Sequence, residues 1–104
     1  MISLNELSLM LAGREPALID RSEGDSRAAV AMIIDSSGSQ SDPKVIFIER
    51  AQDSKDPWSG HMALPGGRCE PSSESVMDAA RRETHEEIGL YLPRDSLLGR
   101  LDDL

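Results

Sequence analysis

The chain has 104 residues, of which 38% are hydrophobic and 29% charged, a balance that argues against a disordered or membrane-embedded chain and fits one small soluble domain. Its 19 acidic side chains outnumber 11 basic ones, which gives a formal net charge of -8. This excess of acid argues against a nucleic-acid partner, because general binding to the phosphate backbone needs Lys and Arg in excess.

The first predicted element is a short amphipathic helix over residues 3–11. Ser3 and Glu6 have the spacing of a capping box, and leucines recur at helical intervals after Ser3. A polar connector follows the helix. We therefore expect residues 1–27 to hold an N-terminal helix and a connector, and residues 28–104 to form the main domain.

Strands are predicted next, at residues 28–34 and 45–48. The first is a continuous apolar run, which favours a strand covered on both faces, and the second is β-branched and aromatic. A loop rich in Ser, Gly and Asp separates the two strands, so we expect them to form a hairpin. Residues 62–64 favour a further short strand that Pro65 and two glycines halt, and one more strand is expected to begin near residues 97–98.

The strongest predicted helix covers residues 74–90. Ser72 or Ser73 is expected to cap its N-terminus, and Gly89 followed by Pro93 closes it. At about 100° per residue, five side chains share an apolar arc of roughly 120°. These side chains are Val76, Met77, Ala80, Thr84 and Ile88. The opposite, solvent-facing side holds Glu74, Asp78, Arg81, Arg82 and His85.

Three glutamates break this helical pattern. Glu87 falls inside the apolar arc, Glu83 lies at its margin, and Glu86 lies a further step round the helix. Local rules broken together are expected at functional sites, and clustered carboxylate oxygens select Mg²⁺, Mn²⁺ or Ca²⁺. The alternative is structural, with the three acids solvated or paired with an arginine. The arginines considered for such pairing are Arg50, Arg68 and Arg82.

The segment as a whole closely resembles the Nudix box. That pattern reads Gly, five residues, Glu, seven residues, Arg-Glu, an aliphatic, any residue, Glu-Glu, any residue, Gly, an aliphatic. The matching positions are Gly67, Glu74, Arg82, Glu83, Glu86, Glu87, Gly89 and Leu90. Thr84 departs from the pattern because the family has an aliphatic residue there, and six residues rather than five separate Gly67 from Glu74. The box thus spans residues 67–90, and the spacing of its helical glutamates is unchanged.

The resemblance implies an α/β fold, a Nudix-like α/β/α sandwich on a mixed sheet. We expect this sandwich to be incomplete at the C-terminus, because the chain stops at Leu104, soon after the box. The resemblance also implies a hydrolase of nucleoside diphosphate derivatives that uses Mg²⁺ or Mn²⁺. The implied metal ligands are Glu83, Glu86, Glu87 and the Gly67 backbone. Catalytic roles fall to Glu83, Glu86 and Arg82, with Arg82 orienting the glutamates by ion pairing. The general base differs across the family and is not assigned.

Substrate contacts are expected from Arg50, Trp58, His61, Gly66 and Gly67. Arg50 together with residues 58–67 is somewhat similar to the lead-in of Nudix members that cleave coenzyme A. Trp58 stands where those members have histidine, so ADP-ribose-like and nucleotide-sugar substrates stay open. Trp58 either stacks on a substrate ring or covers the edge of the core, and His61 either approaches the phosphate or bonds the backbone.

Two other functions stay open: a non-catalytic Nudix-like module that binds a nucleotide, and an inactive fragment of such an enzyme. His85 is expected to be an ordinary surface histidine, because Gly89 stands where a zinc protease motif needs its second histidine. The single Cys69 fits a reducing compartment, and no stretch is long and apolar enough to span a membrane. We therefore expect a cytoplasmic protein without a membrane partner. The resemblance leaves a homodimer open.

Overall fold

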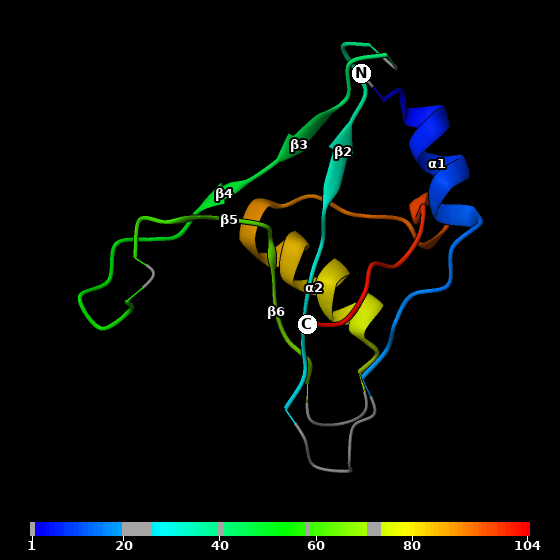
Figure 1. Ribbon diagram of the computed structural model, residues 1–104. Helices are drawn as coiled ribbons and strands as arrows, with labels where there is room; N and C mark the ends of the chain where they lie inside the picture. Colours follow the sequence, from blue (N-terminus) through cyan, green and yellow to red (C-terminus); the bar gives the residue numbers. More distant parts are fainter. Residues whose placement is uncertain (1, 20–25, 40, 58, 71–73) are drawn as a thin grey trace. The chain divides into compact units, whose positions relative to one another are not determined.

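The computed structural model describes residues 2–19, 26–39, 41–57, 59–70 and 74–104 (Figure 1). The chain divides into two compact units. The first comprises Met1–Asp25, Asp35–Lys44 and Pro93–Leu104, and the second comprises Ser26–Ile34 and Val45–Leu92. Residues 67–90 lie wholly within the second unit, which therefore holds the candidate site.

Helix α1 (Leu4–Ala12) begins as its sequence predicts. The Ser3 hydroxyl accepts a hydrogen bond from the Glu6 amide at 3.1 Å, and it lies 3.2 Å from the Glu6 carboxylate. Gly13 ends the helix. The prediction of a helix over residues 3–11 is confirmed, with each bound one residue later than expected.

Polar contacts within the first unit tie the segment after α1 to the last residues of the chain. Arg14 donates to the Arg100 carbonyl at 3.1 Å and to the Asp102 carboxylate. Asp102 also accepts from the Ala17 amide at 2.8 Å, and the Asp103 amide donates to the Ala17 carbonyl at 2.9 Å. A charged pair and backbone hydrogen bonds therefore hold these two segments together.

The described strands are β1 (Ala28–Val30), β2 (Ile33–Asp35), β3 (Lys44–Ile46), β4 (Ile48–Glu49), β5 (Met62–Ala63) and β6 (Gly66–Arg68). They pair as three two-stranded sheets, β1 with β6, β2 with β3 and β4 with β5. The β1–β6 and β4–β5 pairs are antiparallel. The mixed α/β class is confirmed, whereas the described residues form no single mixed sheet, because each strand is only two or three residues long. The sandwich stays a prediction.

The prediction of one strand over residues 28–34 is wrong. The run is divided between β1 and β2, and between them the Ala31 amide donates to the Pro65 carbonyl at 2.8 Å. Pro65 has no amide hydrogen to return this bond, so the regular ladder stops at Ala31. Val30 and Met32 are 61% and 52% exposed, so the run is not covered on both faces. Residues 45–48 are likewise divided, between β3 and β4.

Strand β5 ends before Pro65, as predicted, but the two glycines that follow begin a further strand, β6. The glycines pair with β1, Gly66 opposite Val30 and Gly67 opposite Ala29. A Cβ atom on Gly66 would lie 2.2 Å from the Ala29 carbonyl oxygen, so no side chain fits there. The glycines thus serve a close approach of two backbones.

Helix α2 (Val76–Ile88) confirms the strongest predicted helix with narrower bounds. The Ser75 hydroxyl caps its N-terminus by accepting from the Asp78 amide at 3.1 Å. Gly89 adopts φ +70°, and its amide donates to the His85 carbonyl at 2.9 Å. The two serines predicted as caps, Ser72 and Ser73, lie outside the described residues.

Helix α2 packs against β1 and β6 (Figure 1). Ala79 and Thr84 are fully buried on the packed face, and the Thr84 hydroxyl donates to the Ala80 carbonyl at 2.6 Å. Glu87 was expected on this face but is exposed, and Ile88 is 40% exposed. Both residues lie in the last turn of α2, beyond the buried Thr84, and the Glu87 carboxylate turns to accept from the Gly66 amide.

After α2 the chain contains a short 3₁₀ turn, η1 (Arg94–Ser96). The strand expected near residues 97–98 is absent from the described part of the chain. No helix within the described residues has the length and hydropathy needed to cross a membrane.

Candidate functional site

The guanidinium of Arg82 bonds several acidic side chains of the box at once. Arg82 donates from Nε to Glu74 Oε2 at 2.9 Å and from Nη2 to Glu74 Oε1 at 3.0 Å. Its Nη1 donates to Glu83 Oε1 at 3.0 Å and to Glu86 Oε2 at 3.2 Å. Its Nη2 also donates to the Arg68 carbonyl at 3.0 Å, which ties α2 to the end of β6. Arg82 was expected on the solvent face, yet only 26% of its side chain is exposed.

This arrangement has an excess of negative charge. Glu70 approaches the same guanidinium, with 3.8 Å between its Oε1 and Arg82 Nη1, so one cation faces four carboxylates. The Glu74 carboxylate raises the pKa of Arg82 most strongly, and the bonds to Glu83 and Glu86 raise it further. In return, the Arg82 bonds and the Glu70 amide lower the pKa of Glu74. Glu74 and Arg82 therefore stay ionised near neutral pH.

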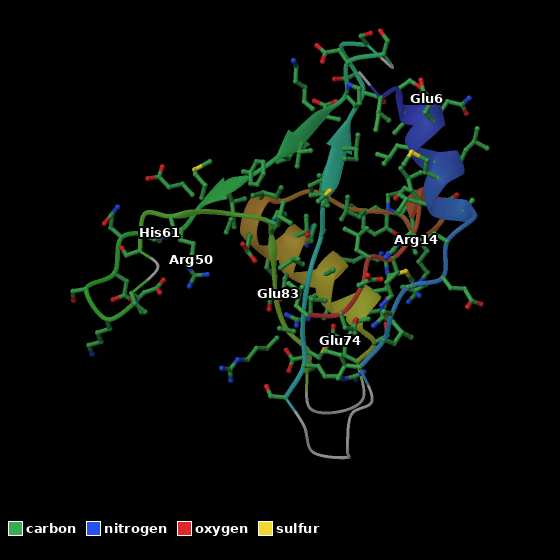
Figure 2. All side chains as sticks on the ribbon, in the orientation of Figure 1. Glu6, Arg14, Arg50, His61, Glu74 and Glu83 are labelled. Carbon is green, nitrogen blue, oxygen red and sulfur yellow. The ribbon has the colours of Figure 1, made fainter. Side chains whose placement is uncertain are left out.

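Strand β6 lies directly against the glutamates of α2. The Gly66 amide donates to Glu87 Oε1 at 3.2 Å. A Cβ atom on Gly67 would lie 2.5 Å from the Glu83 carboxyl carbon, so only glycine leaves room for that carboxylate. Figure 2 shows Glu83 on α2, on the side of the helix where β6 runs. The box glycines thus set the space in which the acidic side chains lie.

The donor set suits a hard divalent cation in its chemistry. Hydrogen bonds engage Oε1 of Glu83 and Oε1 of Glu87, and the second oxygen of each has no hydrogen-bond partner among the described residues. Carboxylate oxygens are the ligands that Mg²⁺ and Mn²⁺ prefer. Within the described residues, however, no group of three or more His, Cys, Asp or Glu side chains is arranged to hold a metal ion. Arg82 takes up the carboxylate oxygens that a cation would otherwise share.

The structure places the predicted substrate contacts in two groups. Gly66 and Gly67 adjoin the glutamates, whereas Arg50 and His61 lie on the arm formed by β4, β5 and the loop between them (Figure 2). Arg50 donates to Asp56 Oδ2 from Nε at 3.1 Å and from Nη2 at 2.8 Å, and its amide bonds the His61 carbonyl at 2.9 Å. No hydrogen bond found for Arg50 reaches the box glutamates. Trp58 lies outside the described residues.

Two arginines that hold the ends of the box were not predicted from the sequence as site residues. Arg27 donates from Nη2 to the Glu74 carbonyl at 3.1 Å. Arg81 was expected to face solvent, yet its Nε donates to the Leu92 carbonyl at 2.6 Å and its guanidinium lies 5.4 Å from the centre of the Tyr91 ring. The Asp78–Arg81 spacing of three residues signals an ion pair, which forms at 3.2 Å, but no sequence signal marks a carbonyl acceptor. His85 is exposed, as predicted.

Known proteins resemble this chain across the same region. A family model described as the NUDIX domain matches residues 25–104. An uncharacterized protein of Schizosaccharomyces pombe is 40% identical over 93 residues, which cover 74% of this chain and 28% of that protein. Mitochondrial coenzyme A diphosphatase NUDT8 of Homo sapiens is 30% identical over 74 residues, which cover 71% of this chain and 31% of that protein. A probable nudix hydrolase of S. pombe is 60% identical over 35 residues, which cover 34% of this chain and 12% of that protein.

The chain spans less than a third of the length of each of these relatives. No solved structure matches it. The matched residues 25–104 make up most of the chain and include α2, β1, β6 and every carboxylate that meets Arg82. The chain therefore belongs to the Nudix family.

Proposed function

We propose that this protein is a divalent-metal-dependent hydrolase that cleaves the pyrophosphate bond of nucleoside diphosphate derivatives. The observation that carries the proposal is the gathering of four carboxylates around Arg82, beside the glycines of β6. Glu74 and Glu83 are only 15% and 23% exposed, and negative charge crowded at such partly buried positions is costly unless a cation offsets it. The similarity to a coenzyme A diphosphatase supports the same class of reaction.

Each residue of the cluster has a separate task in this proposal. Glu83, Glu86, Glu87 and the Gly67 backbone would hold Mg²⁺ or Mn²⁺, which supplies charge neutralisation at the diphosphate and lowers the pKa of a bound water. Arg82 orients Glu83 and Glu86 through the ion pairs described above. The Gly66 amide orients Glu87 by donating its hydrogen to Glu87 Oε1. The general base stays unassigned.

For the substrate we favour coenzyme A and related diphosphates over ADP-ribose-like or nucleotide-sugar compounds. The sequence from Arg50 to Gly67 is similar to the lead-in of coenzyme A-cleaving Nudix members, and a human relative is named as a coenzyme A diphosphatase. The Arg50 side chain is 46% exposed, so its guanidinium is accessible to an anionic group. His61, on the same arm, and Trp58, which lies outside the described residues, are the other candidate contacts.

Metal binding is the first test, because it separates the proposal from a purely structural acidic helix. The melting temperature of the purified protein is measured at increasing Mg²⁺ or Mn²⁺ concentration. It should rise, since a ligand that binds the folded state stabilises that state. Glu87→Gln removes one carboxylate and should reduce that shift. A wild-type protein with no metal-dependent shift, or an equal shift in the variant, contradicts the proposed site.

Substrate turnover separates an enzyme from a non-catalytic nucleotide-binding module. Purified protein with Mg²⁺ is incubated with coenzyme A, ADP-ribose and a dinucleoside polyphosphate, and the products are separated chromatographically. We expect cleavage of coenzyme A at least as fast as of the others. Much faster cleavage of ADP-ribose or the dinucleoside polyphosphate rejects the coenzyme A assignment, and binding without products favours the module.

A further inference from the structure

Arg27 joins the two ends of the loop that carries the extra residue of the box. This residue directly precedes β1. Its carbonyl accepts from the Cys69 amide at 2.8 Å, and its guanidinium Nη2 donates to the Glu74 carbonyl at 3.1 Å. Cys69 follows β6 and Glu74 precedes the Ser75 cap of α2, so a single residue contacts the chain on both sides of the loop.

Glu74 is consequently held from its backbone and from its side chain at once. The Arg27 bond fixes its carbonyl, while its carboxylate takes both Nε and Nη2 of Arg82. The Glu70 amide adds a third contact, to Glu74 Oε1 at 2.9 Å. The side chain of Glu74 is only 15% exposed, so little solvent competes with these bonds.

The position of Glu74 decides where the Arg82 guanidinium lies. Two of the Arg82 donors are committed to Glu74, and this leaves Nη1 directed at Glu83 and Glu86. A planar guanidinium has its donors in a fixed fork, so a shift at one side moves the other side too. A displaced Glu74 would therefore displace the carboxylates on the next turns of α2.

We propose that Arg27 is a positioning residue for the metal-binding glutamates, acting through Glu74 and Arg82. Six residues rather than five separate Gly67 from Glu74, and Arg27 bonds the chain at Cys69 and again at Glu74. This inference rests on the proposed function, since it assigns Arg27 to the same metal site. It predicts that Arg27 controls metal affinity more than stability of the fold.

The experiment measures Mn²⁺ binding to the purified protein by electron paramagnetic resonance, below the melting temperature of every variant. We expect Arg27→Met to weaken Mn²⁺ binding about tenfold, the lower end of the usual effect of residues that orient metal ligands. Arg27→Lys keeps a donor of similar reach and should restore most of the affinity. Should Arg27→Met fail to fold, Arg27→Gln replaces it, because its shorter side chain does not reach the carbonyl.

Arg68→Met is the matched control. Arg68 lies opposite Ala28 in the β1–β6 register, and Ala28 directly follows Arg27 in the chain. The Arg68 side chain is exposed, and the contact of this residue with Arg82 uses its backbone carbonyl. The variant loses the same charge from the same sheet edge and should bind Mn²⁺ as the wild type does. An equal loss in Arg68→Met and Arg27→Met assigns the effect to net charge and overturns the inference.

A double-mutant cycle separates positioning through Glu74 from a general structural role. If Arg27 acts through Glu74, Arg27→Met should add less than about twofold in a Glu74→Gln background, because interacting residues are not additive. Effects that multiply overturn the inference. Wild-type protein that binds no Mn²⁺ overturns the proposed function itself, whereas wild-type binding with unchanged affinity in Arg27→Met overturns this inference alone.

Discussion

Two arginines, each in its own unit, bind carboxylates from other parts of the chain, and they do so in opposite ways. Arg14 meets one carboxylate, that of Asp102, and a backbone carbonyl, so its charge is matched one to one. Arg82 meets the carboxylates of Glu74, Glu83 and Glu86 and approaches a fourth. Figure 2 labels Arg14 beside the helix of the first unit, Glu83 on α2 of the second, and Glu74 just before that helix begins.

The difference shows which cluster is complete. The Arg14–Asp102 ion pair joins the segment after α1 to the last residues of the chain, and its one positive and one negative charge balance. Around Arg82 the positive charge falls short, and the second oxygens of Glu83 and Glu87 have no hydrogen-bond partner within the described residues. A cluster that needs a further cation for balance is expected at a functional site, whereas a balanced one only joins the chain.

The largest expected effect comes from replacing Arg82, the centre of the unbalanced cluster that it forms with Glu70, Glu74, Glu83 and Glu86. Arg82→Met leaves three carboxylates without their shared partner, so they repel each other and lose their orientation. We expect kcat/KM for the pyrophosphate substrate to fall about 100-fold, as for the loss of strong outer-shell partners of metal ligands. Steady-state hydrolysis at saturating Mg²⁺ measures this.

Arg14→Met is the comparison for that result. It should lower the melting temperature only slightly, because surface ion pairs contribute little. It should change kcat/KM by less than about twofold, because the bonds of Arg14 go to Arg100 and Asp102 and not to the box glutamates. If both variants lose activity to the same degree, the two clusters do not differ in kind. Arg82→Lys should not rescue, since an ammonium cannot match the two parallel bonds to Glu74.

The second prediction concerns the room that glycine leaves at the unbalanced cluster. Gly67→Ala places a Cβ atom 2.5 Å from the Glu83 carboxyl carbon, so Glu83 must move. Activity should fall about tenfold, the lower end of the effect of disturbed metal ligands, with a higher Mg²⁺ requirement. Activity assays across a Mg²⁺ titration measure both changes.

Gly89→Ala serves as the control for this substitution. A Cβ atom at Gly89 meets nothing within 4 Å, but the residue has φ +70°. The variant should lose about 1 kcal/mol of stability, because alanine is strained in that region, and should keep its Mg²⁺ dependence. A higher Mg²⁺ requirement in Gly89→Ala as well would show that helix strain, and not the position of Glu83, causes the change at Gly67.

The sequence predicted the elements whose cause is local. The Ser3 cap of α1, the Gly89 end of α2, the buried Thr84 and the exposed His85 follow from neighbouring residues, as does the box pattern itself, whereas the cap of α2 is Ser75 and not the predicted Ser72 or Ser73. The strand divisions at residues 28–34 and 45–48 depend on which partner each strand finds, and periodicity carries no information on that. Glu87 is exposed because it lies in the last turn of α2 and bonds the Gly66 amide, whereas the helical wheel treats every turn alike. The Arg27 bond ends on a carbonyl, which no side-chain pattern marks.

A smaller effect is expected at Thr84, where this chain departs from the aliphatic residue of its family. Thr84 is fully buried, and its hydroxyl bonds the Ala80 carbonyl at 2.6 Å. Thr84→Val has the same shape and should change stability by less than about 1 kcal/mol, because that carbonyl keeps its helical partner. Thr84→Leu should cost about 1–3 kcal/mol by overpacking. Urea denaturation distinguishes the two, and an equally tolerated leucine would show that the core is loose around α2.

The smallest expected effect is a pH dependence in the balanced cluster. The Ala17 amide and then the Arg14 guanidinium lower the pKa of Asp102 from its ordinary value of 3.8. A carboxyl with a lowered pKa in the folded state stabilises the fold above its unfolded value, and that contribution is lost as the pH falls through the folded value. Asp102→Asn should therefore lower the melting temperature at pH 7, with the difference shrinking below pH 3.8. Because the Ala17 amide is the larger cause of the lowered pKa, Arg14→Met should keep much of this pH dependence. If the difference in melting temperature between wild type and Asp102→Asn stays constant from pH 7 to pH 2, the Asp102 contacts stabilise through shape and not through charge.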